Sequence, residues 1–267
     1  MDPLSGACRD VFGRALRARQ PLHGGDLSEV TLVELDDGQR VVAKEGPLVA
    51  REARMLAALA AADAPVPRVL GLSGPVLFLE ALTEGRAGPA AWARFGADLA
   101  RLHGTLGAGY GWHEDYAFGP VAIGNGGAEN WPDFWADRRL RPFLPHLPRA
   151  LALRVERLAD RLPDQLPARP AAALLHGDLW AGNLLPASGR IKLIDPACYY
   201  GDREVDLAML HLFGAPGDGF WQGYGALEPG WQPRRAIYAL FPALVHVRLF
   251  GAGYHAMAER FLGSAGV

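Results

Sequence analysis

Cysteine is scarce in this chain of 267 residues, which contains only Cys8 and Cys198. The two are far apart and lack the spacing of metal ligands, so we expect neither a disulfide framework nor a cysteine metal site. No apolar run approaches the length of a membrane span, and residues 1–14 lack the apolar core of a signal peptide. These absences favour a protein of a reducing, cytoplasmic compartment.

An excess of positive charge is also missing. Lysine and arginine together number 27 against 29 aspartate and glutamate residues, so the formal net charge is −2. We therefore expect neither a nucleic acid nor a membrane as partner. The hydrophobic fraction of 50% is ordinary for a soluble globular protein, and the length suffices for one large domain or two lobes. The sequence shows no internal repeat and no low-complexity linker.

The most informative stretch lies between residues 176 and 195. It reads His-Gly-Asp-Leu-Trp-Ala-Gly-Asn and, after a turn, Ile-Lys-Leu-Ile-Asp. Asp178 and Asn183 have the spacing of the aspartate and asparagine in the kinase catalytic loop H-R-D-x-x-x-x-N. Asp195 ends an apolar run that is typical of a strand.

These residue types suit phosphoryl transfer. The reaction needs a carboxylate that orients and deprotonates the attacking hydroxyl, and Asp178 is the candidate base. It also needs oxygen ligands for Mg²⁺, a hard cation. Asn183 and Asp195 are the candidate ligands for a Mg²⁺ ion that bridges the phosphates of ATP. Together the three residues predict a phosphotransferase.

A β-hairpin is expected near the amino terminus, with strands at 31–35 and 40–44 joined by the turn sequence Asp-Asp-Gly-Gln. The second strand ends Val-Val-Ala-Lys, which matches the pattern of a strand lysine on nucleotide phosphates and makes Lys44 the candidate. Gly24 and Gly25 precede the hairpin. They are candidates for a flap over the phosphates, because a backbone without Cβ atoms can approach a ligand closely.

The next element should be a helix from Pro47 to about Ala62. Glu52 lies near its apolar face, where a carboxylate could hold Lys44 on the phosphates. Glu45 competes for that role, since it adjoins the lysine in sequence.

A short apolar strand at 76–80 precedes the place where a kinase-like fold has its hinge. Backbone groups of a hinge contact the adenine edge, so Glu80 and Leu82 are candidates for nucleotide binding. We accordingly expect a nucleotide-binding lobe at residues 1–82 and a catalytic and substrate lobe at 83–267.

Helical periodicity predicts most other elements. We expect helices at 4–19, 89–103, 131–140 and 151–162, the last ended by Pro163, and a closing helix near 240–254. The glycine-rich residues 104–130 are predicted to form a loop. His103 is interpreted as a structural residue at a helix end, and Asp206 as support for the catalytic loop, either as a cap or as an acceptor for loop amides.

Two segments, 178–183 and the run Asp-Pro-Ala-Cys-Tyr-Tyr-Gly-Asp-Arg-Glu-Val-Asp-Leu-Ala-Met at 195–209, resemble the fructosamine kinase (ketosamine-3-kinase) family. This family is related to aminoglycoside phosphotransferases and choline kinases. The resemblance covers most of the chain and extends to 24–25, 44, 51–53, 96–103, 130–142 and 250–254. It implies an α+β, protein-kinase-like two-lobed fold, with a small antiparallel β-sheet in the N-lobe and a mainly helical C-lobe.

The resemblance also implies an activity: ATP-dependent phosphorylation of the 3-hydroxyl of a ketosamine, free or on a protein lysine, as deglycation repair. Trp180 and Tyr199 lie in the family-like segments and are candidate substrate contacts. The indole of Trp180 could pack on the C–H face of a sugar or simply fill the core. The sequence departs from the family pattern at two places. In the flap, Asp26 could repel phosphate. Residues 104–130 also differ from the family's usual sequence, which puts the prediction of the acceptor pocket in doubt.

Other acceptors and a non-catalytic role are alternatives. An aminoglycoside would require a cluster of acids late in the chain, where residues 215–267 contain only Asp218, Glu228 and Glu259. Choline would require an aromatic cage, for which the candidates are Trp221, Tyr224 and Trp231. A nucleotide-binding pseudokinase is disfavoured because all three predicted catalytic residues are present.

Overall fold

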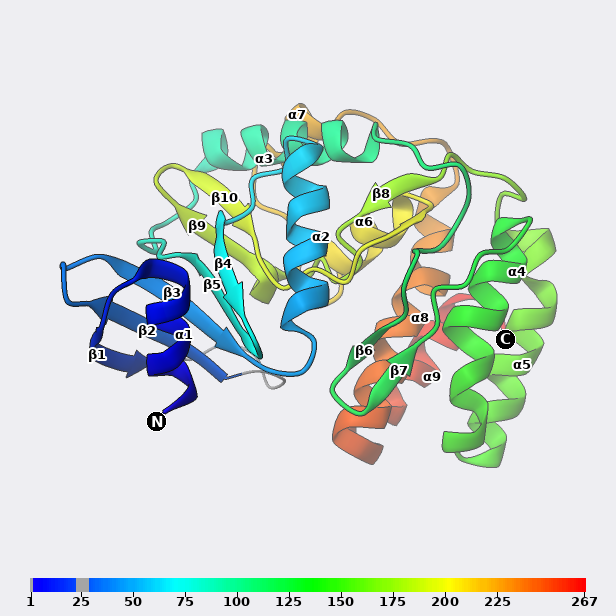
Figure 1. Ribbon diagram of the computed structural model, residues 1–267. Helices are drawn as coiled ribbons and strands as arrows, with labels where there is room; N and C mark the ends of the chain where they lie inside the picture. Colours follow the sequence, from blue (N-terminus) through cyan, green and yellow to red (C-terminus); the bar gives the residue numbers. More distant parts are fainter. Residues whose placement is uncertain (1, 23–28) are drawn as a thin grey trace.

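The N-terminal part of the protein is an antiparallel sheet of five strands in the order β1-β2-β3-β5-β4 (Figure 1). The computed structural model describes residues 2–22 and 29–267. Gly24, Gly25 and Asp26, predicted to form the nucleotide flap, lie outside these residues. The strands are β1 Leu16–Pro21, β2 Glu29–Leu35, β3 Arg40–Glu45, β4 Val69–Ser73 and β5 Val76–Glu80.

Two helices cover opposite faces of this sheet. Helix α1 (Pro3–Phe12) packs on the face that contains Val41 and Ala43, whereas α2 (Val49–Ala61) lies against the other face. Because side chains alternate along a strand, Lys44 at the end of β3 points toward α2 rather than α1. The Lys44 side chain therefore lies on the α2 side of the sheet, where it can contact the C-terminal part of the protein.

The first predicted helix is too long. It ends at Phe12, because Gly13 adopts a left-handed conformation with φ of 64° and caps it. Residues 16–21 form β1 instead and pair with β2. The hairpin at β2 and β3 and the strand β5 are confirmed, and the helix expected from Pro47 begins two residues later, at Val49.

The remaining chain is mainly helical. Its longer helices are α3 Pro89–His103, α5 Arg149–Gln165, α8 Trp231–Phe250 and α9 His255–Ser264. Shorter ones are α4 Trp131–Trp135, α6 Glu204–Leu210 and α7 Phe220–Tyr224. Three two-stranded ladders complete it: β6 Tyr116–Phe118 with β7 Val121–Ile123, β8 Ala173–Leu175 with β11 Tyr199–Gly201, and β9 Leu184–Ala187 with β10 Arg190–Leu193.

Several boundaries differ from the sequence-based expectations. The aromatic helix divides into α4 and a π-helical turn at Ala136–Leu140, and the predicted loop contains the β6–β7 hairpin. Helix α5 continues past Pro163 to Gln165, since a proline in the last turn interrupts little of the hydrogen-bond ladder. The predicted α3 is confirmed at both ends.

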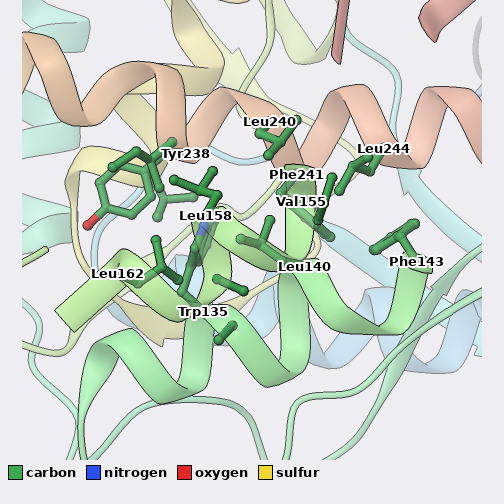
Figure 2. Packing of buried hydrophobic residues seen from close by; sticks show 14 of the residues in the cluster. Trp135, Leu140, Phe143, Val155, Leu158, Leu162, Tyr238, Leu240, Phe241 and Leu244 are labelled. Atoms are coloured by element: carbon green, nitrogen blue, oxygen red, sulfur yellow. The ribbon is translucent and has the colours of Figure 1, made fainter. Parts of the chain in front are cut away.

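Buried aromatic and aliphatic side chains from α4, the π-helical turn, the short helical turn Arg141–His146, α5 and α8 form the core of the C-terminal part (Figure 2). The segment 231–264 is in fact long and apolar enough to cross a membrane, contrary to the expectation from the sequence. More than half of its most apolar window is buried inside the molecule, so its apolar character is explained by this core. Helix α8 runs beside the β6–β7 hairpin (Figure 1). Side chains of α8 form one wall of the site described next.

Candidate active site

Lys44 joins the sheet to the catalytic segment. Its Nζ atom lies 2.7 Å from Oε2 of Glu52 on α2 and 2.6 Å from Oδ1 of Asp195, which follows β10. Burial works to lower the pKa of Lys44, but the carboxylates of Glu52 and Asp195 outweigh it and raise this pKa above its ordinary value. The lysine is thus a buried cation. Glu45 lies on the opposite side of β3, so the structure pairs Lys44 with Glu52 and not with its sequence neighbour.

Asp206 holds the backbone that precedes the predicted base. Its two carboxylate oxygens accept hydrogen bonds from the amides of His176, at 2.7 Å, and Gly177, at 2.9 Å. His103 at the end of α3 contacts the same carboxylate at 3.2 Å. Gly177 has a φ of 81°, and a Cβ there would collide with the carbonyl of Ala197. The supporting roles predicted for Asp206 and His103 are therefore found.

Asp178 follows this turn and faces Asn183. The Nδ2 atom of Asn183 donates to Oδ2 of Asp178 at 2.9 Å and to its main-chain carbonyl at 2.7 Å. Burial raises the pKa of Asp178 to about 7, although the hydrogen bond from Asn183 opposes the shift. Nearby Asp195 and Asp206 add to the rise by like-charge repulsion. A carboxyl with a pKa near neutrality is suited to proton transfer.

The donor set fits a magnesium ion. Nδ2 of Asn183 is used on Asp178, which directs its Oδ1 away from that contact, and Oδ1 of Asp195 contacts Lys44. One oxygen of each side chain therefore remains for a hard cation, and both residues line the same cavity. Across residues 2–22 and 29–267 no group of three His, Cys, Asp or Glu side chains gathers as a metal site, so phosphate and water would supply the other ligands.

A cavity of about 480 Å³ opens beside these residues. Its catalytic end contains Lys44, Asp178, Asn183 and Asp195. The other walls come from Trp180 in the loop of Asp178, the β6–β7 hairpin, the end of α6 with the residues after it, and α8 with the turn after it. They consist of Tyr116, Phe118, Trp180, Met209, Phe213, Phe241, Pro242, Val245, His246, Leu249, Phe250 and Tyr254. The cavity is thus charged at one end and mostly aromatic and aliphatic elsewhere.

Trp180 is well placed for a bound molecule. Its side chain is 37% exposed and its ring lies 5.8 Å from that of Phe213, edge to face. It lines the cavity rather than filling the core. This favours the first of the two interpretations of Trp180, a surface for the substrate.

Tyr199 does not line this cavity, so its predicted contact with substrate needs correction. It is only 2% exposed; the guanidinium of Arg139 covers one face of its ring at 4.3 Å, and Phe134 stacks nearby. In β11, Tyr199 pairs with Leu175. Its alternation along that strand directs the ring into the core.

Glu80 and Leu82 lie at the end of β5 and just after it, at the join between the sheet and the helical part. The Glu80 carboxylate is occupied by Arg68 at 2.8 Å and Lys192 at 3.4 Å. Any contact of Glu80 with adenine would therefore use its main chain. That role for Glu80 and Leu82 stays a prediction.

The aromatic residues suggested for a choline cage lie elsewhere. Trp221 stacks on His211, and the hydroxyl of Tyr224 bonds His103 at 2.8 Å. Trp231 packs near Trp221. None of these three side chains lines the described cavity. Apart from Trp180, its aromatic walls come from residues that the sequence did not mark as a site. For these other aromatic residues, the only signal in the sequence was that Phe250 and Tyr254 lie in the family-like segment 250–254.

Comparisons with known proteins agree with this geometry. The family model for fructosamine kinase matches residues 5–265. A probable ketoamine kinase of Thermus thermophilus is 38% identical over 270 residues, which cover 95% of this chain and 96% of the relative. One from Synechocystis is 40% identical over 197 residues, covering 70% of this chain and 66% of the relative.

Solved structures give the same result. A fructosamine-3-kinase candidate from Thermobifida fusca superposes with a TM-score of 0.91 at 32% identity, covering 99% of both chains. An ADP-bound aminoglycoside phosphotransferase shares only the fold, with a TM-score of 0.59 at 14% identity over 97% of this chain and 94% of the other. The α+β kinase-like fold is therefore confirmed. With the family model covering nearly all of it, the chain belongs to the fructosamine kinase family and is a phosphotransferase.

Proposed function

We propose that this protein transfers the γ-phosphoryl group of ATP to the 3-hydroxyl of ketosamines. The observation that carries the proposal is the position of Asp178, which is bonded to Asn183 at one end of a cavity shared with the Lys44–Asp195 pair. A base, a buried cation and two oxygen ligands thus border one acceptor space. Membership of the fructosamine kinase family supports the ketosamine as acceptor.

In the proposed reaction, Asp178 accepts the proton of the 3-hydroxyl while that oxygen attacks the γ-phosphorus and ADP departs. Its pKa of about 7 balances deprotonation of the hydroxyl against later release of the proton. Lys44 neutralises charge on the nucleotide phosphates, and Asn183 and Asp195 would hold Mg²⁺, which supplies further charge neutralisation when bound. Trp180 offers its exposed indole to the sugar.

The acceptor cavity disfavours an aminoglycoside. Among the described residues that line it, the only carboxylates are those of Asp178 and Asp195. A polycation would need several more acids to bind. We extend the proposal to a repair role in the cytoplasm, because a ketosamine phosphorylated at its 3-hydroxyl is unstable and releases the amine.

The test is a turnover assay with Mg-ATP and a panel of fructosyl-, ribulosyl- and erythrulosyl-amines, with choline and kanamycin as control acceptors. Asp178→Ala should abolish phosphorylation while ATP binding, measured by calorimetry, is retained. Asp164→Ala, on the exposed side of α5, is the matched control and should leave turnover unchanged. Phosphorylation retained in Asp178→Ala would reject the base; turnover of a control acceptor alone would reject the ketosamine.

A further inference from the structure

His246 lies on α8 where that helix forms a wall of the cavity. Its Nδ1 atom is 2.7 Å from the carbonyl oxygen of Pro242, one turn earlier in the helix. Because a carbonyl oxygen can only accept a hydrogen bond, Nδ1 carries the hydrogen. In the neutral ring Nε2 is then an acceptor. Within residues 2–22 and 29–267 no protein group bonds Nε2, so its lone pair is available to a molecule in the cavity.

Aromatic rings surround His246. The ring centroids of Phe213, Phe250 and Tyr254 lie 5.7, 5.5 and 4.9 Å from that of His246. Phe213 in turn contacts Trp180 of the catalytic loop. The rings form a continuous wall from the catalytic end of the cavity, and Phe213 and Phe250 are 52% and 47% exposed. A ligand bound at Asp178 therefore has this aromatic wall within the same cavity.

The charges of the cavity are unevenly distributed. Lys44, Asp178 and Asp195 lie together at the catalytic end, and the described residues of the α8 wall include no carboxylate. A cationic group at that wall would be held by aromatic faces and by a neutral acceptor instead of an ion pair. The secondary ammonium of a ketosamine is such a group, since it carries one positive charge and two N–H donors.

We propose that Nε2 of His246 accepts a hydrogen bond from the amine nitrogen of the acceptor, and that Phe213, Phe250 and Tyr254 receive the substituent on that nitrogen. The inference rests on the proposed function and deepens it, because it specifies the substrate class as ketosamines whose nitrogen bears an apolar or aromatic group. In a ketosamine the amine is on C1, two carbons from the C3 hydroxyl. One end of the molecule can thus reach Asp178 while the other lies along α8.

The experiment compares two acceptors, fructosyl-benzylamine and its ether analogue 1-O-benzyl-fructose, which has no N–H donor. His246→Asn keeps a donor for the Pro242 carbonyl and removes Nε2. It should raise KM for the amine about tenfold, as expected for a lost hydrogen bond to a charged group, with kcat changed less than about twofold and the ether unaffected. His246→Gln places an amide oxygen near the former Nε2 position and should recover part of the loss.

His211→Asn is the matched control. His211 has the same arrangement, with Nδ1 2.8 Å from the carbonyl of Leu207 one turn earlier and a stacked aromatic ring, but it lies outside the cavity. This variant should leave both KM values unchanged. His246→Phe, which keeps a ring and removes both nitrogens, repeats the test if His246→Asn fails to fold.

Two results would overturn the inference while the proposed function stands. They are an unchanged KM for the amine in His246→Asn, and an equal rise in KM for amine and ether. Absence of turnover of any ketosamine by the wild-type protein would overturn the proposed function and this inference together. A tenfold rise in KM for the amine, with KM for the ether unchanged, supports both the proposed function and this inference.

Discussion

Asp206 shows how one residue that does not line the cavity positions the proposed base, Asp178. It is fully buried and its two oxygens accept the amides of His176 and Gly177. Two oxygens on one side chain match two adjacent N–H groups, and only a carboxylate offers both as acceptors. The position of Asp178, the next residue along the chain, follows from this match.

The variant Asp206→Asn tests whether this carboxylate positions Asp178. The amide has nearly the same size but replaces one acceptor with an NH₂ group, which would face a buried N–H donor. We expect a loss of about 1.5–3 kcal/mol in the free energy of unfolding and a kcat reduced roughly tenfold or more. Urea denaturation and steady-state kinetics measure the two effects, with Asp164→Asn on the surface as control. A variant as stable and active as the wild type would show that the carboxylate is dispensable.

At the scale of elements, α7 lies unusually close to α3. A Cβ built on Gly223 would collide with the carbonyl of Ala93, and one on Gly96 with the carbonyl of Phe220. Glycine at both positions lets the two backbones approach to a separation that any side chain would prevent. The contact fixes α3, whose last residue, His103, touches Asp206.

Gly223→Ala should therefore destabilise the protein by about 1–3 kcal/mol, the usual range for overpacking. Gly263→Ala in α9 is the matched control, since the nearest atom to its added Cβ is 4.0 Å away. Alanine favours a helix over glycine, so the control should be neutral or more stable by up to about 1 kcal/mol. Equal denaturation midpoints for the two variants would contradict the close approach.

At the scale of the whole molecule, the sheet and the cavity are linked through α2. Arg54 donates two hydrogen bonds to Glu114, at 2.9 and 2.6 Å, and Arg51 donates to the carbonyl of Asp115 at 2.7 Å. Glu114 and Asp115 precede β6, which supplies Tyr116 and Phe118 to the cavity. Glu52, the partner of Lys44, is on the same helix as the two arginines.

This connection predicts that Glu114→Gln raises KM for the acceptor roughly threefold by loosening the hairpin, because it weakens a link between two sites. Stability should hardly change, since partly exposed ion pairs contribute little. Glu34→Gln removes a comparable surface pair with Arg17 on β1 and serves as control. If Glu114→Gln, Glu34→Gln and the wild type have the same KM for the acceptor, α2 and the cavity are not connected through Glu114.

The sequence by itself determined the short-range features of this protein. Asp178 and Asn183 are five residues apart within one loop, so their spacing alone brings them into contact. The β2–β3 hairpin follows from its turn sequence, and α3 from its periodicity and terminal residues. Glu52 was a candidate partner for Lys44 because it lies near the apolar face of a predicted helix, but Glu45 stayed open until the structure showed the pair.

Tertiary structure alone decided the rest. Lys44 and Asp195 meet across 151 residues, and residues 16–19, predicted as the end of the first helix, form β1 because β2 offers a partner for pairing. Tyr199 lies in the core, whereas His246 lines the cavity. The same apolar and aromatic residue types fill a core and line a cavity. Residue type alone therefore does not tell from the sequence which of the two positions a side chain takes. Only the packing of α8 against the β6–β7 hairpin decided which of these side chains line the cavity and which fill the core.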